Sequence, residues 1–233
     1  MQRCHEVSLE DSGFVVLPKL ISAEKRERLS LAYDAAMSTG SAPDLRVSRD
    51  GSNIRLNHLI DYGTEFDDLL VLGSIMDLCE HVIGRRFKLS GLLARTVLPG
   101  ATEQSLHVDV AVNSADWPLV GFIVMVDDFR DDNGATRFVP GSHKWAQAWK
   151  DATTKDRPVH DQCIAACGLA GSVIVFNGST WHAQGANVSN APRRSIQGAY
   201  IPLAGTCATD WRSLQSQILA RLPSGTKQIL GAE

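Results

Sequence analysis

Apolar positions at the start of the chain form one short run and then repeat at helical spacing. Residues 14–17 form the run, which Pro18 closes, and such a run indicates a strand. Ser22 is suited to cap a helix, and apolar residues recur behind it every three or four positions as far as Met37. The pattern therefore predicts a strand followed by a helix that ends near Met37.

A second stretch with helical spacing follows beyond a polar segment. Residues 40–51 are rich in Ser, Gly, Pro and Asp, a composition typical of a loop. Apolar residues then recur at positions i, i+3, i+4 and i+7 from Phe66 to Val82. We therefore expect a loop and then a second helix, which Gly84 terminates.

From residue 86 onward the apolar positions change from helical to extended spacing. Turn residues separate the strand-like stretches about every ten positions, as in a β-sandwich or barrel. The stretch Asp131–Gly134 contains an Asn-Gly pair, which is a strong hairpin signal. The expected strands span residues 87–98, 119–126, 136–139, 159–166, 172–176 and 195–201.

Helical spacing returns near the end of the chain, over Trp211–Leu222. No internal repeat, low-complexity linker or second apolar core interrupts the pattern. We therefore expect one domain over residues 1–233. It would have helices in its first third, a β-core over about 86–202 and a helical tail.

Composition and charge are those of an ordinary soluble domain, and they exclude several classes of protein. The 233 residues carry 23 Lys and Arg against 26 Asp and Glu, so the net charge is −3. Proteins that bind nucleic acid or an anionic membrane usually have a basic excess, so neither partner is expected. No apolar run could span a membrane and the N-terminus has no signal-peptide core, so we expect a cytoplasmic protein.

The five cysteines indicate free thiols rather than a disulfide framework. Their number is odd, their spacing is irregular, and no export signal precedes them. His160, Cys163 and Cys167 lie close together, but they lack the paired CxxC spacing of a zinc site. Zinc is therefore not expected there, and the histidines of the β-core are the better candidates for metal chemistry.

The segment Leu106-His107-Val108-Asp109 offers two metal ligands at a suggestive spacing. Residues two apart on a strand point to the same face, so His107 and Asp109 could bind one ion together. His182 follows just after the strand expected at 172–176. Two histidines and one carboxylate form the facial triad of non-haem Fe(II) oxygenases, which leaves positions open for a co-substrate and oxygen.

Arg193 and Ser195 form a second pair, again two residues apart on an expected strand. A guanidinium group binds both oxygens of a carboxylate at once, and a hydroxyl adds a further hydrogen bond. The pair is therefore a good receptor for the far end of a 2-oxo acid whose other end chelates iron. Arg194 points to the opposite face of the same strand.

Four segments in this order resemble the phytanoyl-CoA dioxygenase family, a branch of the Fe(II)/2-oxoglutarate oxygenases. They are LHVDV, DDNGATRFVPGSHKW, GSVIVFNGSTWHAQGANVS and PRRS. The start GFVVLPKLIS also resembles the family's N-terminal segment, so the similarity covers roughly residues 12–202. The resemblance implies a mainly β fold with flanking helices. This fold is a cupin-like double-stranded β-helix, or jelly roll, with the site inside the barrel mouth.

The resemblance also implies roles for individual residues. The residues that match the family's iron ligands are His107, Asp109 and His182. Arg193 matches the arginine that binds the distal carboxylate of 2-oxoglutarate, and Ser195 completes the family's Arg-x-Ser arrangement. Thr136 matches a position that hydrogen-bonds the co-substrate.

The implied enzyme is an Fe(II)- and 2-oxoglutarate-dependent dioxygenase. It would use O2, with ascorbate as an optional reductant, to hydroxylate a small-molecule substrate and release succinate and CO2. Related halogenases have a small residue in place of Asp109, so its carboxylate favours hydroxylation, desaturation or ring formation over halogenation. Two alternatives stay open: a cupin-like metalloenzyme without 2-oxoglutarate, and a non-catalytic jelly-roll module that binds or senses a ligand.

Other polar residues are candidates for the substrate pocket. Arg95 either lines the pocket or pairs with a surface acid, and Gln184 either reaches the iron-side carboxylate or lies on the surface. We expect the segments 40–60 and 110–118 to shape the pocket.

Overall fold

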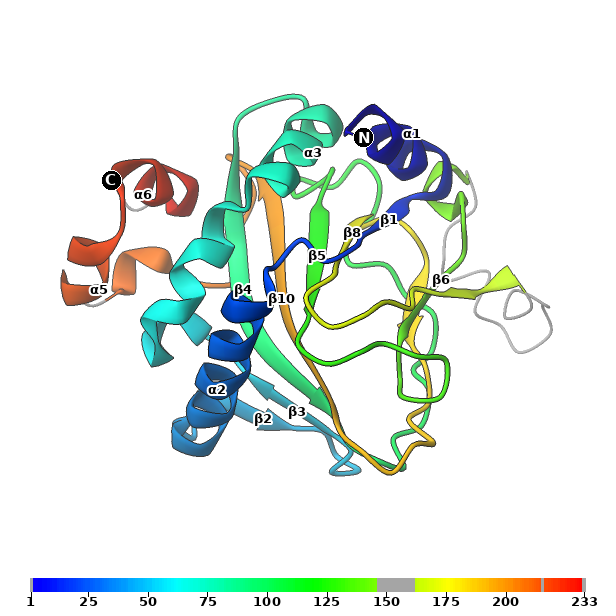
Figure 1. Ribbon diagram of the computed structural model, residues 1–233. Helices are drawn as coiled ribbons and strands as arrows, with labels where there is room; N and C mark the ends of the chain where they lie inside the picture. Colours follow the sequence, from blue (N-terminus) through cyan, green and yellow to red (C-terminus); the bar gives the residue numbers. More distant parts are fainter. Residues whose placement is uncertain (1, 146–161, 215, 232–233) are drawn as a thin grey trace.

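Two antiparallel sheets that face each other form the centre of the molecule (Figure 1). The computed structural model describes residues 2–145, 162–214 and 216–231. The large sheet has seven strands in the order β1-β8-β5-β10-β4-β3-β2, and the small sheet has three in the order β7-β6-β9. Most consecutive strands of the chain are not neighbours, and the chain crosses between the two sheets as in a jelly roll. The predicted fold class is confirmed.

The strands are short except for two long ones at the centre of the large sheet. The large sheet consists of β1 (Phe14–Leu17), β2 (Leu45–Val47), β3 (Asn53–Leu56), β4 (Phe87–Val97), β5 (Val120–Met125), β8 (Val173–Asn177) and β10 (Arg193–Pro202). The small sheet consists of β6 (Thr136–Phe138), β7 (Ile164–Ala165) and β9 (His182–Gln184).

Helices cover one face of the large sheet, while the small sheet covers the other (Figure 1). The α-helices are α1 (Gln2–Ser12), α2 (Ala23–Thr39), α3 (Gly73–Ile83), α5 (Ser216–Arg221) and α6 (Ser224–Leu230). The 3₁₀ helices are η1 (Leu59–Tyr62), η2 (Thr64–Val71), η3 (Ser142–Lys144) and η5 (Trp211–Ser213).

The two faces of the sheet follow from the alternation of side chains along each strand. In β5, Phe122 and Val124 belong to the apolar core beneath the helices, whereas Ile123 and Met125 belong to the core between the sheets. In β8, Ile174 likewise faces the small sheet. A strand buried on both faces is apolar throughout, which explains the continuous apolar run at residues 120–126.

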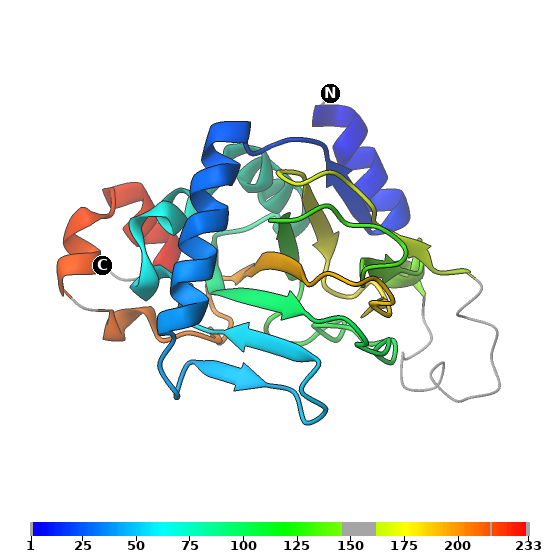
Figure 2. The same cartoon turned by 60° about the horizontal axis from the view of Figure 1, so that its bottom comes forward.

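The helix α2 closes the helical face and begins where the sequence predicts. Ser22 caps it by accepting a hydrogen bond from the Lys25 amide at 3.3 Å. Tyr33 is buried, and its hydroxyl lies 2.8 Å from the Thr96 hydroxyl of β4. Figure 2 shows α2 lying across the large sheet, with β2, β3, β4 and β10 following one another from the edge. The helix thus buries its apolar stripe while its one polar core group stays hydrogen-bonded.

The predicted helix over Phe66–Val82 is divided into two pieces. Residues 64–71 form the 3₁₀ helix η2, Leu72 is extended (φ −71°, ψ 111°), and α3 begins at Gly73. Phe66 and Leu69 are buried three positions apart, a spacing that a 3₁₀ helix brings onto one side. The break lets η2 and α3 each bury its own apolar stripe. Gly84 ends α3 in the left-handed conformation, as predicted.

The predicted loop over residues 40–51 contains the strand β2, so this part of the prediction is wrong. Strands β2 and β3 form a hairpin at the sheet edge, and the Ser48 amide hydrogen-bonds to the Asn53 carbonyl at 2.8 Å. The polar composition of the segment reflects an edge strand with exposed side chains, which sequence alone does not separate from a loop.

The turn at Asp131–Gly134 forms, and Gly134 adopts the left-handed conformation with φ +81°. The strands on either side, β5 and β6, belong to different sheets. The hairpin prediction is therefore wrong: the Asn-Gly turn carries the chain from one sheet to the other.

The chain ends contain more helix than the sequence predicts. The stretch Trp211–Leu222 divides into η5 and α5, and α1 and α6 were not predicted. Asp210 caps η5 by accepting from the Arg212 amide, which starts a separate short turn.

Two cysteine predictions have different outcomes. None of the cysteines with described side chains forms a disulfide; these are Cys79, Cys163, Cys167 and Cys207. His160 lies outside the described residues, so the expectation of no zinc site beside Cys163 and Cys167 stays a prediction.

Residues 159–161 of the predicted strand 159–166 also lie outside the described residues, and within residues 162–166 only Ile164–Ala165 pairs as a strand. Within the described residues, no helix combines the length and apolar character needed to cross a bilayer. One domain over the whole chain stays a prediction.

Candidate functional site

Three candidate metal ligands meet between the two sheets because the backbone pairs two distant segments. His107 and His182 form an isolated antiparallel bridge, with amide-to-carbonyl hydrogen bonds of 2.9 Å in both directions. The Asp109 amide donates to the Gly178 carbonyl at 2.8 Å. The side-chain ligand atoms of His107, Asp109 and His182 all lie within 4.8 Å of one another. The structure therefore brings together the three residues predicted as the metal site.

Hydrogen bonds fix the tautomer of both histidines. The His107 Nδ1 atom lies 3.1 Å from the Ser105 carbonyl, and the His182 Nδ1 atom lies 2.8 Å from the Thr180 carbonyl. A carbonyl oxygen only accepts, so each Nδ1 carries a proton, and in the neutral imidazole the lone pair is then on Nε2. Backbone carbonyls hold metal-binding histidines in many proteins in this way. Both Nε2 atoms are thus prepared to bind an ion.

The electrostatics of the cluster favour the metal-binding protonation states. Burial lowers the pKa of His107, and the neighbouring His182 lowers it further. Burial alone would raise the pKa of Asp109, but the contact with His182, 3.6 Å from the carboxylate, and nearby positive charges hold this pKa below its usual range. Near neutral pH the cluster therefore presents a neutral imidazole beside an ionised carboxylate.

Arg193 lies deep in the same interior, and no described carboxylate is within ion-pair distance of it. Its side chain is 1% exposed, and its Nη1 and Nη2 donate to the Ser195 hydroxyl and the Gly134 carbonyl. The guanidinium carbon lies 4.3 Å from the centre of the Phe129 ring. The Nε atom is buried and has no hydrogen-bond partner. Burial lowers the pKa of Arg193 to about 10, so the group stays charged at neutral pH and requires an acceptor.

Ser195 and Thr136, the two predicted hydroxyl groups of the co-substrate site, have different surroundings. The Ser195 hydroxyl accepts from Arg193 and donates to the Arg95 carbonyl at 3.2 Å. It is fully buried, and its one proton is used by the backbone. Ser195 therefore positions Arg193 in this structure, and a contact with a carboxylate stays a prediction. Thr136, on β6, lines the pocket that Arg193 also lines.

Arg95 and Gln184 form a second buried polar pair in the pocket that the candidate metal ligands also line. The Arg95 side chain donates to the Gln184 side-chain oxygen at 2.5 Å and to the Asn53 side-chain oxygen at 3.2 Å. Arg95 is 8% exposed and Gln184 is 3% exposed. Both line the pocket, so the pocket alternative for Arg95 is confirmed and a surface position for Gln184 is wrong.

The pocket encloses a cavity of about 250 Å³ between the sheets. Sequence reasoning missed the glutamines Gln104 and Gln197 in its lining. Gln197 continues the alternation that begins with Arg193 and Ser195, so that period could have found it. The segment 40–60 contributes Arg55, as expected, whereas none of the described lining residues comes from 110–118. The expectation for 110–118 is therefore wrong.

A jelly roll with two histidines and one carboxylate converging inside it defines the class of non-haem Fe(II) oxygenases. The family model described as phytanoyl-CoA dioxygenase matches residues 9–195 of this sequence. The chain belongs to the phytanoyl-CoA dioxygenase family.

Individual relatives in this family are similar over different shares of the chain. "Dioxygenase af480" of Aspergillus fumigatus is 28% identical over 204 residues, which cover 84% of this chain and 65% of that protein. "Dioxygenase cdmA" of Talaromyces verruculosus is 39% identical over 106 residues, which cover 42% of this chain and 34% of that protein. The chain thus spans less than two thirds of either relative.

Solved structures show the same fold at low sequence identity. The α-ketoglutarate-dependent epimerase SnoN from nogalamycin biosynthesis has a TM-score of 0.72 at 18% identity, covering 86% of this chain and 80% of that one. EctD from S. alaskensis with bound Fe has a TM-score of 0.73 at 16% identity, covering 88% and 78%.

Proposed function

We propose that this protein is an Fe(II)- and 2-oxoglutarate-dependent dioxygenase that hydroxylates a small molecule and releases succinate and CO2. One observation carries the proposal. Two histidine lone pairs and a carboxylate converge within 4.8 Å in a pocket that also holds a buried arginine with an unpartnered donor. The first set of groups suits Fe(II), and the arginine suits the far carboxylate of the co-substrate.

The donor set fits iron better than other common ions. Imidazole nitrogen with carboxylate oxygen is the ligand set of Fe(II) oxygenases, whereas thiolates would favour zinc or copper. We assign the ligands to His107 Nε2, His182 Nε2 and an Asp109 oxygen. Bound iron would supply the activation of O2 that is coupled to decarboxylation of 2-oxoglutarate. The chain itself holds both imidazoles in the required tautomer and keeps Asp109 ionised.

Arg193 fits the distal carboxylate of 2-oxoglutarate on independent grounds. A buried cation with an unmatched donor is costly unless an acceptor completes it. The Ser195 hydroxyl and the Gly134 carbonyl hold the guanidinium group in place, so little order remains to be created on binding. Thr136, across from Gln184 in the small sheet, is positioned to add a hydroxyl donor. A cupin-like metalloenzyme without 2-oxoglutarate would leave this receptor without a purpose.

The reaction type rests on Asp109. Its carboxylate occupies the position that halogenases leave open for chloride, which supports oxygen insertion into a C–H bond. Solved neighbours include an epimerase and the carbocyclase SnoK, so hydrogen abstraction followed by a different outcome is the second candidate. In either case the residues of the pocket must place one substrate C–H bond and exclude water.

Anaerobic titration of the purified protein with Fe(II) and then 2-oxoglutarate tests the proposal. We expect a visible charge-transfer band that saturates at one equivalent of iron, because chelation of Fe(II) by a 2-oxo acid gives such a band. Succinate in place of 2-oxoglutarate is the matched control. It is also a dicarboxylate but lacks the keto group, so it should give no band. A protein that binds iron without producing the band would contradict the assignment of the co-substrate.

A further inference from the structure

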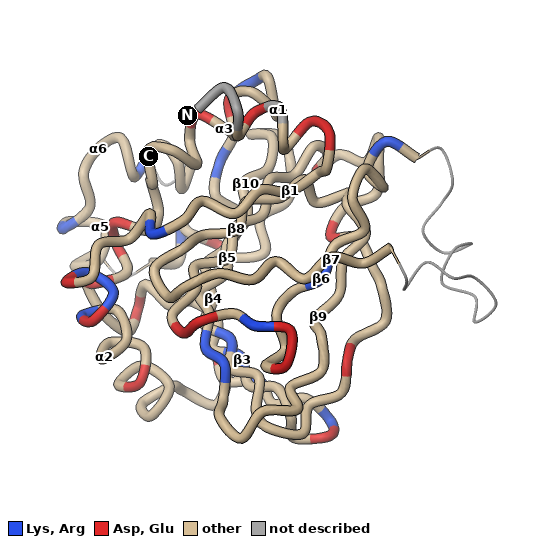
Figure 3. Tube along the Cα trace, turned by 45° about the vertical axis from the view of Figure 1, so that its right-hand side comes forward, with Lys and Arg blue, Asp and Glu red and all other residues tan. Residues whose placement is uncertain are grey.

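Arginines form a row across the sheet edge and lead from the surface to the metal cluster. The register places Arg46 of β2 opposite Arg55 of β3, and Arg55 opposite Arg95 of β4. Directly opposed residues in a sheet have side chains on the same face. Blue segments lie together in Figure 3 where β3 and β4 run side by side. The row passes from exposed Arg46 and Arg55 to Arg95, which is 8% exposed.

Like charges opposed across strands destabilise a sheet unless other groups compensate them. Among the ion pairs of the described residues, none involves Arg55 or Arg95. Burial and the charges of Arg55 and Arg193 lower the pKa of Arg95 to about 9, although the charge of Asp109 opposes part of this shift. The arrangement resembles a site whose negative partner is a ligand.

Two buried hydrogen-bond donors, one on Arg95 and one on Gln184, define where that ligand would bind. Arginine only donates, so Gln184 must turn its side-chain oxygen toward Arg95, and its Nε2 group then faces elsewhere. Both the Nε2 of Gln184 and the Nε of Arg95 are buried without an acceptor, and both residues line the pocket. Two unmatched donors on neighbouring side chains call for a group that accepts at two points, as an oxyanion does.

The co-substrate does not account for this second receptor. If the proposed function holds, Fe(II) and Arg193 together balance the charges of Asp109 and 2-oxoglutarate. Asp109 is the one carboxylate among the described lining residues and is then already balanced, so Arg55 and Arg95 remain without a counter-charge of their own. The row also extends to the sheet edge, away from the Arg193 receptor.

We propose that the substrate of this enzyme carries an oxyanion, such as a carboxylate, sulfate or phosphate group, which Arg95 and Gln184 bind with Arg55 at the entrance. This inference rests on the proposed function and narrows its substrate class. The anion fixes one end of the substrate and so determines which carbon reaches the iron. Arg95 is a specificity-determining residue in this scheme, distinct from the Arg193 receptor.

Inorganic sulfate is a suitable probe, because it tests the oxyanion receptor without any knowledge of the rest of the substrate. The protein is loaded anaerobically with Fe(II) and saturating 2-oxoglutarate, and sulfate is titrated by calorimetry at constant ionic strength against chloride. We expect saturable binding to the wild type. In Arg95→Met the affinity should fall at least about tenfold, because a charge-assisted hydrogen bond is lost.

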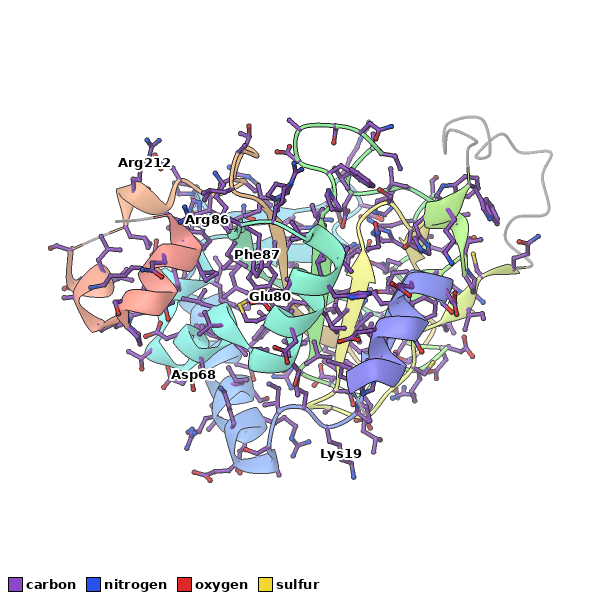
Figure 4. All side chains as sticks on the ribbon, turned by 90° about the horizontal axis from the view of Figure 1, so that it is seen from above. Lys19, Asp68, Glu80, Arg86, Phe87 and Arg212 are labelled. Carbon is purple, nitrogen blue, oxygen red and sulfur yellow. The ribbon has the colours of Figure 1, made fainter. Side chains whose placement is uncertain are left out.

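Three further variants separate recognition from folding and from general charge. Arg55→Gln changes an exposed side chain and should weaken sulfate binding by a smaller factor, so it carries the test if Arg95→Met does not fold. Arg95→Lys keeps the charge and should recover part of the affinity. Arg86→Gln removes an exposed arginine on the helical side of the molecule, next to Phe87 (Figure 4), and should change nothing.

The dissociation constant of 2-oxoglutarate, read from the charge-transfer band, distinguishes the two sources of a bound anion. We expect Arg95→Met to leave it within twofold of the wild type. A tenfold weaker co-substrate would assign Arg95 to 2-oxoglutarate and overturn the proposal, as would unchanged sulfate binding in Arg95→Met. If the wild type shows no band, the proposed function fails, and sulfate titration of the metal-free wild type and Arg95→Met still tests the receptor.

Discussion

Arginine side chains on the two faces of the large sheet have opposite surroundings, as the neighbours Arg193 and Arg194 show. Arg194 points toward the helices, where its guanidinium group binds Asp127 at 2.7 Å and Asp34 at 2.8 Å. Arg193 points between the sheets, has no described carboxylate partner and keeps an unmatched Nε. The arginine on the helical face is thus paired with two carboxylates, whereas the arginine on the interior face requires an acceptor from a ligand.

Other polar groups divide in the same way. On the helical side, the hydroxyl of Tyr200 donates to the Leu70 carbonyl at 2.9 Å, and the Trp211 indole donates to the Leu89 carbonyl at 2.7 Å. Of the four buried side-chain atoms without a partner among the described residues, three line the interior pocket. Buried polar groups are normally satisfied, so a concentration of unmatched donors marks a binding site rather than a structural core.

The largest expected effect comes from Asp109→Ala, which removes one candidate ligand from the interior face. We expect turnover measured as succinate release to fall at least about 1000-fold, since the reaction depends on the metal. The Asp109 side chain is 37% exposed, so the melting temperature of the metal-free protein should change little. A variant that forms succinate at the wild-type rate would contradict the ligand assignment.

Arg193→Met tests the receptor on the same face and should have the next largest effect. The dissociation constant of 2-oxoglutarate should rise about 100-fold, because a buried charged contact is lost. Stability should stay the same or increase, because methionine removes a buried cation that has no paired carboxylate in the described structure. Chemical denaturation of the metal-free protein measures the stability change. A large loss of stability with unchanged co-substrate affinity would show that Arg193 stabilises the fold and does not bind the co-substrate.

Arg194→Met makes the opposite test one residue further along the strand. Asp127 and Asp34 lose their shared partner, so the free energy of unfolding should fall by about 1–2 kcal/mol; the pair is only partly buried. The affinity for 2-oxoglutarate should stay at the wild-type value. Weaker co-substrate binding in this variant would show that the helical face contributes directly to the site.

The smallest expected effect is a pH dependence of metal binding. Burial lowers the pKa of His107 below 6.5, so its imidazole stays neutral and able to bind metal at pH values where a free histidine is protonated. Fe(II) affinity, measured anaerobically, should therefore be constant above pH 6.5 and fall only at lower pH. A loss of Fe(II) affinity that already begins above pH 7 as the pH is lowered would show that burial does not lower the pKa of His107.

Periodicity and spacing predicted most of the core strands, and spacing selected the three candidate ligands that the structure brings together. Two-residue spacing also separated Arg193 from Arg194 on β10. The same rule selected His107 and Asp109, but their segment is not a regular strand: His107 forms only an isolated bridge and Asp109 lies in a bend. The resemblance to the family then implied the jelly roll, which strand patterns alone left as a sandwich or barrel.

Features that depend on contacts between distant segments escaped prediction. The edge strand β2 is polar because one side of it faces solvent, so its composition matches a loop. The division of residues 64–83 at Leu72 follows from how two apolar stripes pack on the sheet. The Arg46, Arg55 and Arg95 row arises from strand register, and no local pattern in a sequence reveals register between β2, β3 and β4.

The backbone bridge between His107 and His182 also implies that the complete iron site would form only late in folding. These two residues are far apart in sequence, and contacts of this kind have high contact order, so they form only when the intervening strands have assembled. A nascent chain still lacking β9 would have at most two of the three ligands. Iron uptake by a ribosome-released chain would therefore report completed folding, and the bound ion would stabilise only that folded state.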